Sequence, residues 1–143
     1  MTDWKNKKSV LAAIHEMDGH ALKKADESLK KDKSIVLEAV MYSGGAALEF
    51  ADKSLLKDKV FILEALKKSG NGYLLKYADE SFRKDKSIVL EVVKQIGIAL
   101  KYVDESFRKD KSIVLAAVKQ DGDSLKYADE SLKKDPDIIK AAK

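Results

Sequence analysis

The chain has 143 residues, enough for one domain of ordinary size, and its 45% hydrophobic content argues against an intrinsically disordered chain. No apolar run comes close to the roughly 20 residues that span a bilayer. The net charge of +4 is too small to indicate nucleic-acid binding by itself, and the absence of cysteine excludes disulfides and thiolate chemistry. The N-terminal residues do not resemble a secretory signal, so we expect a cytoplasmic protein.

A segment of 25 residues recurs along the chain. Residues 76–100 and 101–125 are identical at 19 of 25 positions. More divergent copies are marked by regularly spaced aspartates, which are Asp32, Asp58, Asp85, Asp110 and Asp135. Periodicity in this range is typical of stacked supersecondary units.

The residues after each aspartate predict an α-helix, which we call the leading helix of the repeat. In the copy at 85–109, the apolar residues from Ile88 to Val93 cover a wide helical face. Asp85 can cap the first turn. In the last copy Pro136 follows the aspartate, and proline is favourable at the first helical position and harmful further in.

A second helix, the trailing helix, is predicted over residues 99–109. A glycine separates the two, and we expect it to end the leading helix in the left-handed conformation; these glycines are Gly19, Gly44 or Gly45, Gly70 or Gly72, Gly97 and Gly122. On the exposed face, Asp104 and Arg108 are spaced for an ion pair, as are Glu105 and Lys109. Both helices are too short to be stable alone, so packing between repeats must stabilise them.

The predicted fold class is therefore all-α, an α-solenoid of about five helix–turn–helix repeats of ~25 residues plus a truncated terminal helix. We expect a single helical-repeat domain over residues 1–143. Its repeats lie at about 6–31, 32–57, 58–84, 85–109 and 110–134, with a partial repeat at 135–143.

The string from Asp85 to Ser106 begins Asp-Lys-Ser-Ile-Val-Leu and ends Asp-Glu-Ser. It resembles the bacterial and protist repeat family catalogued as domain of unknown function 4116, and the resemblance covers about residues 8–140. The resemblance implies a helical repeat that often serves as an interaction region. It supplies no established activity and no catalytic residue.

Two patterns that could carry chemistry lack the necessary geometry. His15 and His20 are five residues apart with Gly19 between them, whereas a zinc protease needs two histidines four apart on one helical face. The recurring Asp-Glu-Ser triplet has no histidine base nearby, so we interpret its serine as a small structural residue on the apolar face. We predict no enzyme activity, no cofactor and no metal site.

One position of the trailing helix is aromatic in four repeats, where it holds Phe50, Tyr77, Tyr102 and Tyr127. In a solenoid these positions align, and a column of rings could stack on nucleic-acid bases or hold a peptide. The favoured interpretation is that the rings are half-buried between neighbouring repeats.

The turns before the leading helices are rich in lysine. Four of these lysines occupy the first helical position, where a positive charge opposes the helix dipole; they are Lys33, Lys59, Lys86 and Lys111. A phosphate or an acidic partner would explain them. Because acidic residues are close by, a solvated rim of mixed charge is the favoured interpretation.

Together these features predict a non-catalytic protein–protein interaction module, with the four aromatic residues and the four lysines as candidate contacts. Such a module could be a small bacterial or phage effector that docks on a larger protein and blocks it. The alternative is a nucleic-acid-binding repeat protein that uses the lysine-rich turns and the tyrosines. A third possibility is a purely structural spacer or a self-associating array. We expect a protein partner and no membrane partner, and the oligomeric state stays open.

Overall fold

The computed structural model describes every residue from Met1 to Lys143 and contains helices without strands, which confirms the predicted all-α repeat fold. The leading helices are α1 (Lys7–Met17), α3 (Lys33–Ser43), α5 (Lys59–Ser69), α7 (Lys86–Gln95), α9 (Lys111–Gln120) and α11 (Pro136–Ala142). None of the helices is long and apolar enough to cross a membrane.

The predicted N-caps of the leading helices are confirmed. Asp85 accepts hydrogen bonds from the backbone N–H groups of Ser87 and Ile88 at 3.0 and 3.2 Å. The equivalent pair of bonds forms at Asp32, Asp110 and Asp135. Pro136 lies at the start of α11. A backbone N–H at this position would have no hydrogen-bond partner within the helix, so proline costs no bond there.

The prediction of one continuous trailing helix is wrong. Each trailing segment is a 3₁₀ helix followed by a separate turn of α-helix. The 3₁₀ helices are η1 (Gly19–Lys24), η2 (Gly44–Phe50), η3 (Gly72–Lys76), η4 (Gly97–Tyr102) and η5 (Gly122–Tyr127). The α turns are α2 (Glu27–Lys30), α4 (Lys53–Leu56), α6 (Ser81–Lys84), α8 (Glu105–Arg108) and α10 (Glu130–Lys133).

The Asp-Glu-Ser triplet causes this break. In the fourth repeat Val103 is extended (φ −80°, ψ 166°), and the carboxylate of Asp104 accepts a hydrogen bond from the N–H of Ser106 at 3.1 Å. An aspartate that binds a backbone N–H two residues ahead starts a new helix and does not continue the old one.

The serine of the triplet does not lie on the apolar face, so that expectation is also wrong. Ser28, Ser106 and Ser131 are exposed, and each hydroxyl donates to the aspartate two residues earlier. Ser54, which ends the equivalent Asp-Lys-Ser sequence of the second repeat, makes the same bond. The aspartates of the triplets are therefore caps, although Glu80 and Lys84 do form an ion pair at the i,i+4 spacing predicted for this face. In α10, Glu130 pairs with Lys133 at i,i+3.

The expected left-handed glycine occurs at Gly44 (φ 72°) and Gly70 (φ 63°). The prediction of a left-handed conformation is wrong for Gly19, Gly97 and Gly122, whose φ angles are not positive. Each of these three begins a 3₁₀ helix that packs against the next leading helix. Glycine is required there because the two backbones approach too closely to leave room for a side chain.

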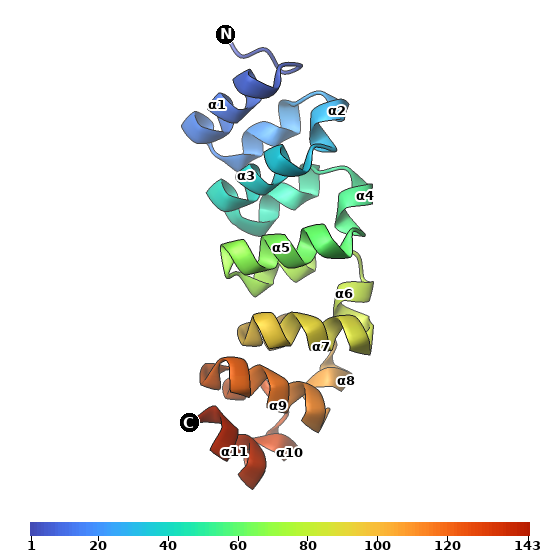
Figure 1. Cartoon of the computed structure of the whole chain (residues 1–143), viewed down its shortest axis with the longest axis vertical. Helices are drawn as coiled ribbons and strands as arrows, with labels where there is room; N and C mark the ends of the chain where they lie inside the picture. Colours follow the sequence, from blue (N-terminus) through green and yellow to red (C-terminus); the bar gives the residue numbers. More distant parts are fainter. The chain divides into compact units, whose positions relative to one another are not determined.

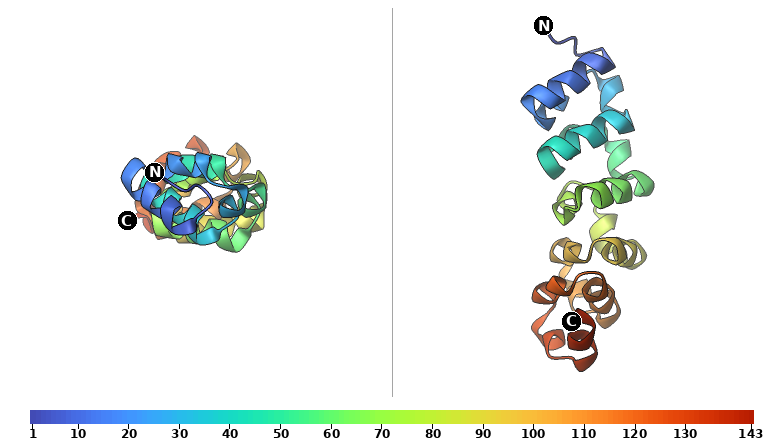
Figure 2. Two further views of the ribbon diagram at one scale, coloured as in Figure 1. Left: turned by 90° about the horizontal axis from the view of Figure 1, so that it is seen from above. Right: turned by 60° about the vertical axis from the view of Figure 1, so that its left-hand side comes forward.

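The contacts divide the chain into two compact units. The N-terminal unit comprises Met1–Ser69 and Lys76–Ala78, and the C-terminal unit comprises Gly70–Leu75 and Asp79–Lys143. Within each unit the leading helices stack in chain order, α1, α3 and α5 in one and α7, α9 and α11 in the other (Figure 1). In the N-terminal unit, α2 and α4 lie on the same side of this stack in Figure 1 and in the right-hand view of Figure 2.

The core of each unit is formed by the inner faces of its helices. In the C-terminal unit Val89, Val92 and Val93 of α7 are buried, together with Leu100 of η4. Leu90, on the edge of the apolar face predicted for α7, is only partly buried. Part of the wide apolar face therefore reaches the surface.

Candidate interaction surfaces

The lysine at the first position of a leading helix pairs with the cap of the next leading helix. Lys86 Nζ lies 2.8 Å from Asp110 Oδ2, and Lys33 Nζ lies 2.8 Å from Asp58 Oδ2. These contacts join residues of successive repeats within one unit. They give a structural reason for a lysine that opposes its own helix dipole, because the lysine stabilises the neighbouring repeat.

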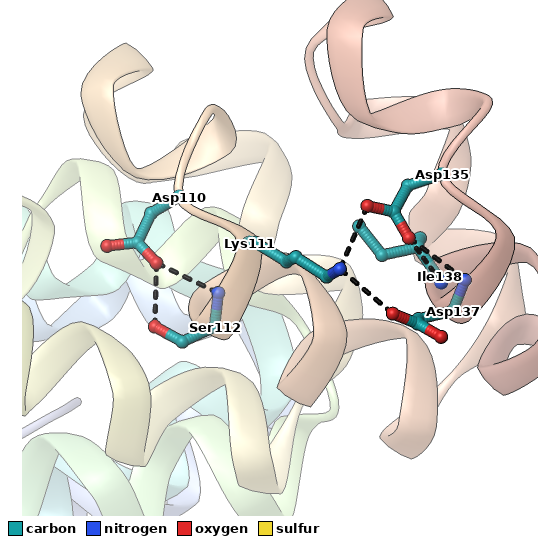
Figure 3. Close-up of polar contacts among 6 residues, drawn as sticks. All are labelled: Asp110, Lys111, Ser112, Asp135, Asp137 and Ile138. Atoms are coloured by element: carbon teal, nitrogen blue, oxygen red, sulfur yellow. Dashed lines mark hydrogen bonds and ion pairs between the residues drawn. The ribbon is translucent and has the colours of Figure 1, made fainter.

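The link at the C-terminal end involves two carboxylates (Figure 3). Lys111 Nζ lies 3.0 Å from Asp135 Oδ2 and 2.9 Å from Asp137 Oδ2. On the other side of Lys111, Asp110 accepts hydrogen bonds from the N–H and the hydroxyl of Ser112 at 2.9 and 2.6 Å. The start of α9 thus combines the Asp110 cap with the ion pairs of the adjacent Lys111.

These contacts shift the protonation equilibria of the turn. The hydrogen bond from Lys86, followed by that from Ser112, lowers the pKa of Asp110 to about 2. The hydrogen bonds to Asp137 and Asp135 raise the pKa of Lys111. Both groups are held in their charged forms, and each is paired with an opposite charge of the chain.

The candidate lysines Lys33, Lys86 and Lys111 are thus all paired with aspartates. Lys59 occupies the equivalent position in the third repeat and is exposed. Their role in binding a partner stays a prediction. The positive charge that they offer to a phosphate is smaller than the sequence suggests.

A second link joins successive repeats through the backbone. The N–H of Asp104 donates to the carbonyl of Arg83 at 2.9 Å, and the N–H of Asp129 donates to that of Arg108 at 2.9 Å. In the N-terminal unit Asp52 makes the same bond. The caps of α4, α8 and α10 therefore also hold the preceding α turn in place.

The candidate aromatic residues Phe50, Tyr77, Tyr102 and Tyr127 are all partly buried. Tyr102 packs edge to face on Tyr73, with ring centroids 5.6 Å apart. Lys101 Nζ lies 5.8 Å from the ring centre of Tyr127, and Lys23 Nζ lies 5.9 Å from that of Phe50. Three of the four rings therefore contact the preceding repeat, and a role for this column in binding stays a prediction.

The two histidines contact different neighbours. His15 Nε2 lies 2.8 Å from Glu38 Oε1, and its ring stacks on Tyr42 with centroids 4.8 Å apart. His20 packs on Phe50 with centroids 5.8 Å apart. The structure contains no group of three or more histidine, cysteine, aspartate or glutamate residues placed to hold a metal ion.

A groove that sequence reasoning missed lies between α7 and α9 of the C-terminal unit. Its volume is about 510 Å³, and its lining includes Leu90, Leu115 and Ala116 together with Lys94 and Lys119. A second groove of about 400 Å³ lies between α9 and α11 and shares Leu115 and Lys119 with the first. The lining of both grooves is mostly apolar.

The sequence contained a signal for this surface. A leucine stands five residues after the cap of each of the first five leading helices, and all five are partly exposed: Leu11, Leu37, Leu63, Leu90 and Leu115. A recurring large apolar side chain at the edge of a helical face predicts an apolar column on the surface, not only a wider core.

Paired helices that recur in series, each packed on its neighbours, define an α-helical repeat protein. The chain belongs to the family described as Domain of unknown function (DUF4116). The family model matches residues 6–46, 43–83, 70–108, 85–133 and 110–142, so each match extends beyond one repeat. No curated protein and no solved structure matches the chain.

Proposed function

We propose that the chain is a non-catalytic protein–protein interaction module. The proposal is carried by the partly exposed leucines of the leading helices, of which Leu90 and Leu115 line an open groove. An open groove lined by exposed apolar side chains is typical of sites that bind another protein chain. The groove lining supplies apolar contact and positive charge, and a binding surface uses both.

The same proposal extends to an effector role, in which the module docks on a larger protein and blocks it. Its support is the repeat content of the chain, because the repeats offer surface for contact over nearly the whole of residues 6–142. Adding the chain in equimolar amount to the partner should lower the partner's activity. An unchanged activity would contradict the effector role and leave the binding role standing.

Affinity purification of the tagged chain from its source cells tests the binding role. The variants to compare are L90E/L115E, which places charge in the groove, and E105Q/E130Q, which changes two exposed glutamates of the trailing segments. We expect a protein partner that the wild-type chain and E105Q/E130Q retain and that L90E/L115E loses. Recovery of nucleic acid alone would support the alternative function, and recovery of neither would overturn the proposal.

A further inference from the structure

The groove between α7 and α9 lies where the chain omits a carboxylate. Six residues after the cap, α3, α5 and α7 carry Glu38, Glu64 and Glu91. The same position holds Ala116 in α9 and Ala141 in α11. Ala116 lines the first groove and Ala141 lines the second. The substitution of alanine for glutamate therefore coincides with both hollows.

In the N-terminal unit this glutamate has an internal partner. Glu38 of α3 contacts His15 of α1 at 2.8 Å, and His15 stands nine residues after its own cap, Asn6. The residue at that position of α7 is Lys94, and in α9 it is Lys119. In the first pair of leading helices of each unit, Glu38 and His15 therefore correspond to Ala116 and Lys94. The carboxylate that would face Lys94 is missing.

Lys94 and Lys119 are exposed, and their side chains make no hydrogen bond or ion pair in the structure. This contrasts with Lys86 and Lys111 at the start of the same helices, which are paired with aspartates. The groove therefore combines apolar side chains with two ammonium groups that form no ion pair within the chain.

We propose that this groove binds an acidic amphipathic helix of a partner protein. The apolar face of that helix packs on Leu90 and Leu115, and its aspartate or glutamate side chains pair with Lys94 and Lys119. A helix that lays an apolar stripe into a groove is a common form of peptide recognition, and the free ammonium groups select acidic flanks. The proposal rests on the protein-binding function above and names its site and the chemistry of its partner.

Selection from a phage-displayed library of random 16-residue peptides on the intact chain tests the proposal. We expect the enriched peptides to carry net negative charge and apolar residues at i, i+3 or i+4, and i+7. The A116E variant restores the carboxylate found at this position in three other repeats, so it should fold. It should weaken binding of the enriched peptides by about tenfold or more, because the added charge repels acidic side chains and occupies the groove.

The matched control is A12E, since Ala12 occupies the same repeat position in α1 of the N-terminal unit and is exposed. A12E should bind the peptides as tightly as the wild-type chain does. Equal binding by A116E and wild type, enrichment of peptides without net negative charge, or no enrichment at all would overturn the groove assignment. So would single-stranded RNA that binds the wild-type chain and not A116E. If the peptide selection failed in any of these ways, a protein partner captured from cells would still support the protein-binding function.

Discussion

Gly97, the first residue of η4, lies directly against the carbonyl oxygen of Ala117 in α9, so closely that a methyl group on Gly97 would overlap that oxygen. The N–H of Gly97 also donates to Gln120 Oε1 at 2.6 Å. The same approach recurs at Gly19 against Ala39 and at Gly122 against Ala142. A glycine in each of these repeats thus seats the 3₁₀ helix on the next leading helix.

The G97A variant should lose about 3 kcal/mol of unfolding free energy, since the added methyl must push two backbone segments apart. The comparison is G70A. Gly70 has a positive φ of 63° but no atom within 4 Å of the added methyl, so only backbone strain of about 1 kcal/mol is expected. Urea unfolding of both variants measures the difference. Equal losses would show that α9 moves away from the added methyl group at little cost, and would contradict the requirement for glycine at position 97.

The elements that the sequence predicted correctly depend on residues close together in the chain. Asp85 and the N–H of Ile88 are three residues apart, and both can be placed from the sequence alone. The break at Asp104 is equally local, and the Asp-Glu-Ser triplet signalled it. Pairing the acidic residues with Arg108 and Lys109 predicts a continuous helix instead, because it gives the aspartate no role as a cap.

The parts that could not be predicted join residues far apart in the chain. Lys86 pairs with Asp110, and Gly97 meets Ala117, because the leading helices stack with one particular register. The periodicity shows that repeats are equivalent but does not show which faces meet. The groove at Ala116 could not be predicted for the same reason. The sequence does not show that Ala116 of α9 and Lys94 of α7 line the same groove.

The stability of the chain should fall in acid because the cap aspartates must be charged. The pKa of Asp110 in the folded chain is about 2, lowered first by the hydrogen bond from Lys86. An unfolded aspartate titrates at about 3.9, so the contribution is complete above that pH and is lost as the pH falls through about 2. Urea unfolding between pH 5 and pH 2 should therefore show a decline in unfolding free energy below about pH 4.

The D110N variant isolates this residue. Asparagine is also a good N-cap, so the helix start is kept while the titrating group is removed. We expect D110N to show a shallower decline than the wild-type chain between pH 4 and pH 2, and K86M to lie between the two. A decline in D110N as steep as that of the wild type would assign the acid sensitivity to other carboxylates.

The short α turns should depend on their cap more than on the serine that follows. Asp104 caps α8, and its N–H also joins the preceding repeat through the carbonyl of Arg83. D104A keeps that N–H and loses the cap, so it should lower the unfolding free energy by about 1 kcal/mol. S106A removes only an exposed hydroxyl and should lower it less. A larger loss for S106A than for D104A would contradict the role of the triplet as a helix start.

One residue of the core should be improved by substitution. Ser124 in η5 is fully buried, and its hydroxyl has no hydrogen-bond partner. Alanine is buried at the equivalent position in other repeats, as at Ala99 and Ala47. S124A removes the unsatisfied hydroxyl and fits the same space, so it should raise the unfolding free energy by about 1 kcal/mol. S112A provides the contrast, because the Ser112 hydroxyl is exposed and donates to Asp110. S112A should lower the unfolding free energy slightly in the same urea titration. A loss of stability in S124A would mean that the buried hydroxyl of Ser124 does form a hydrogen bond.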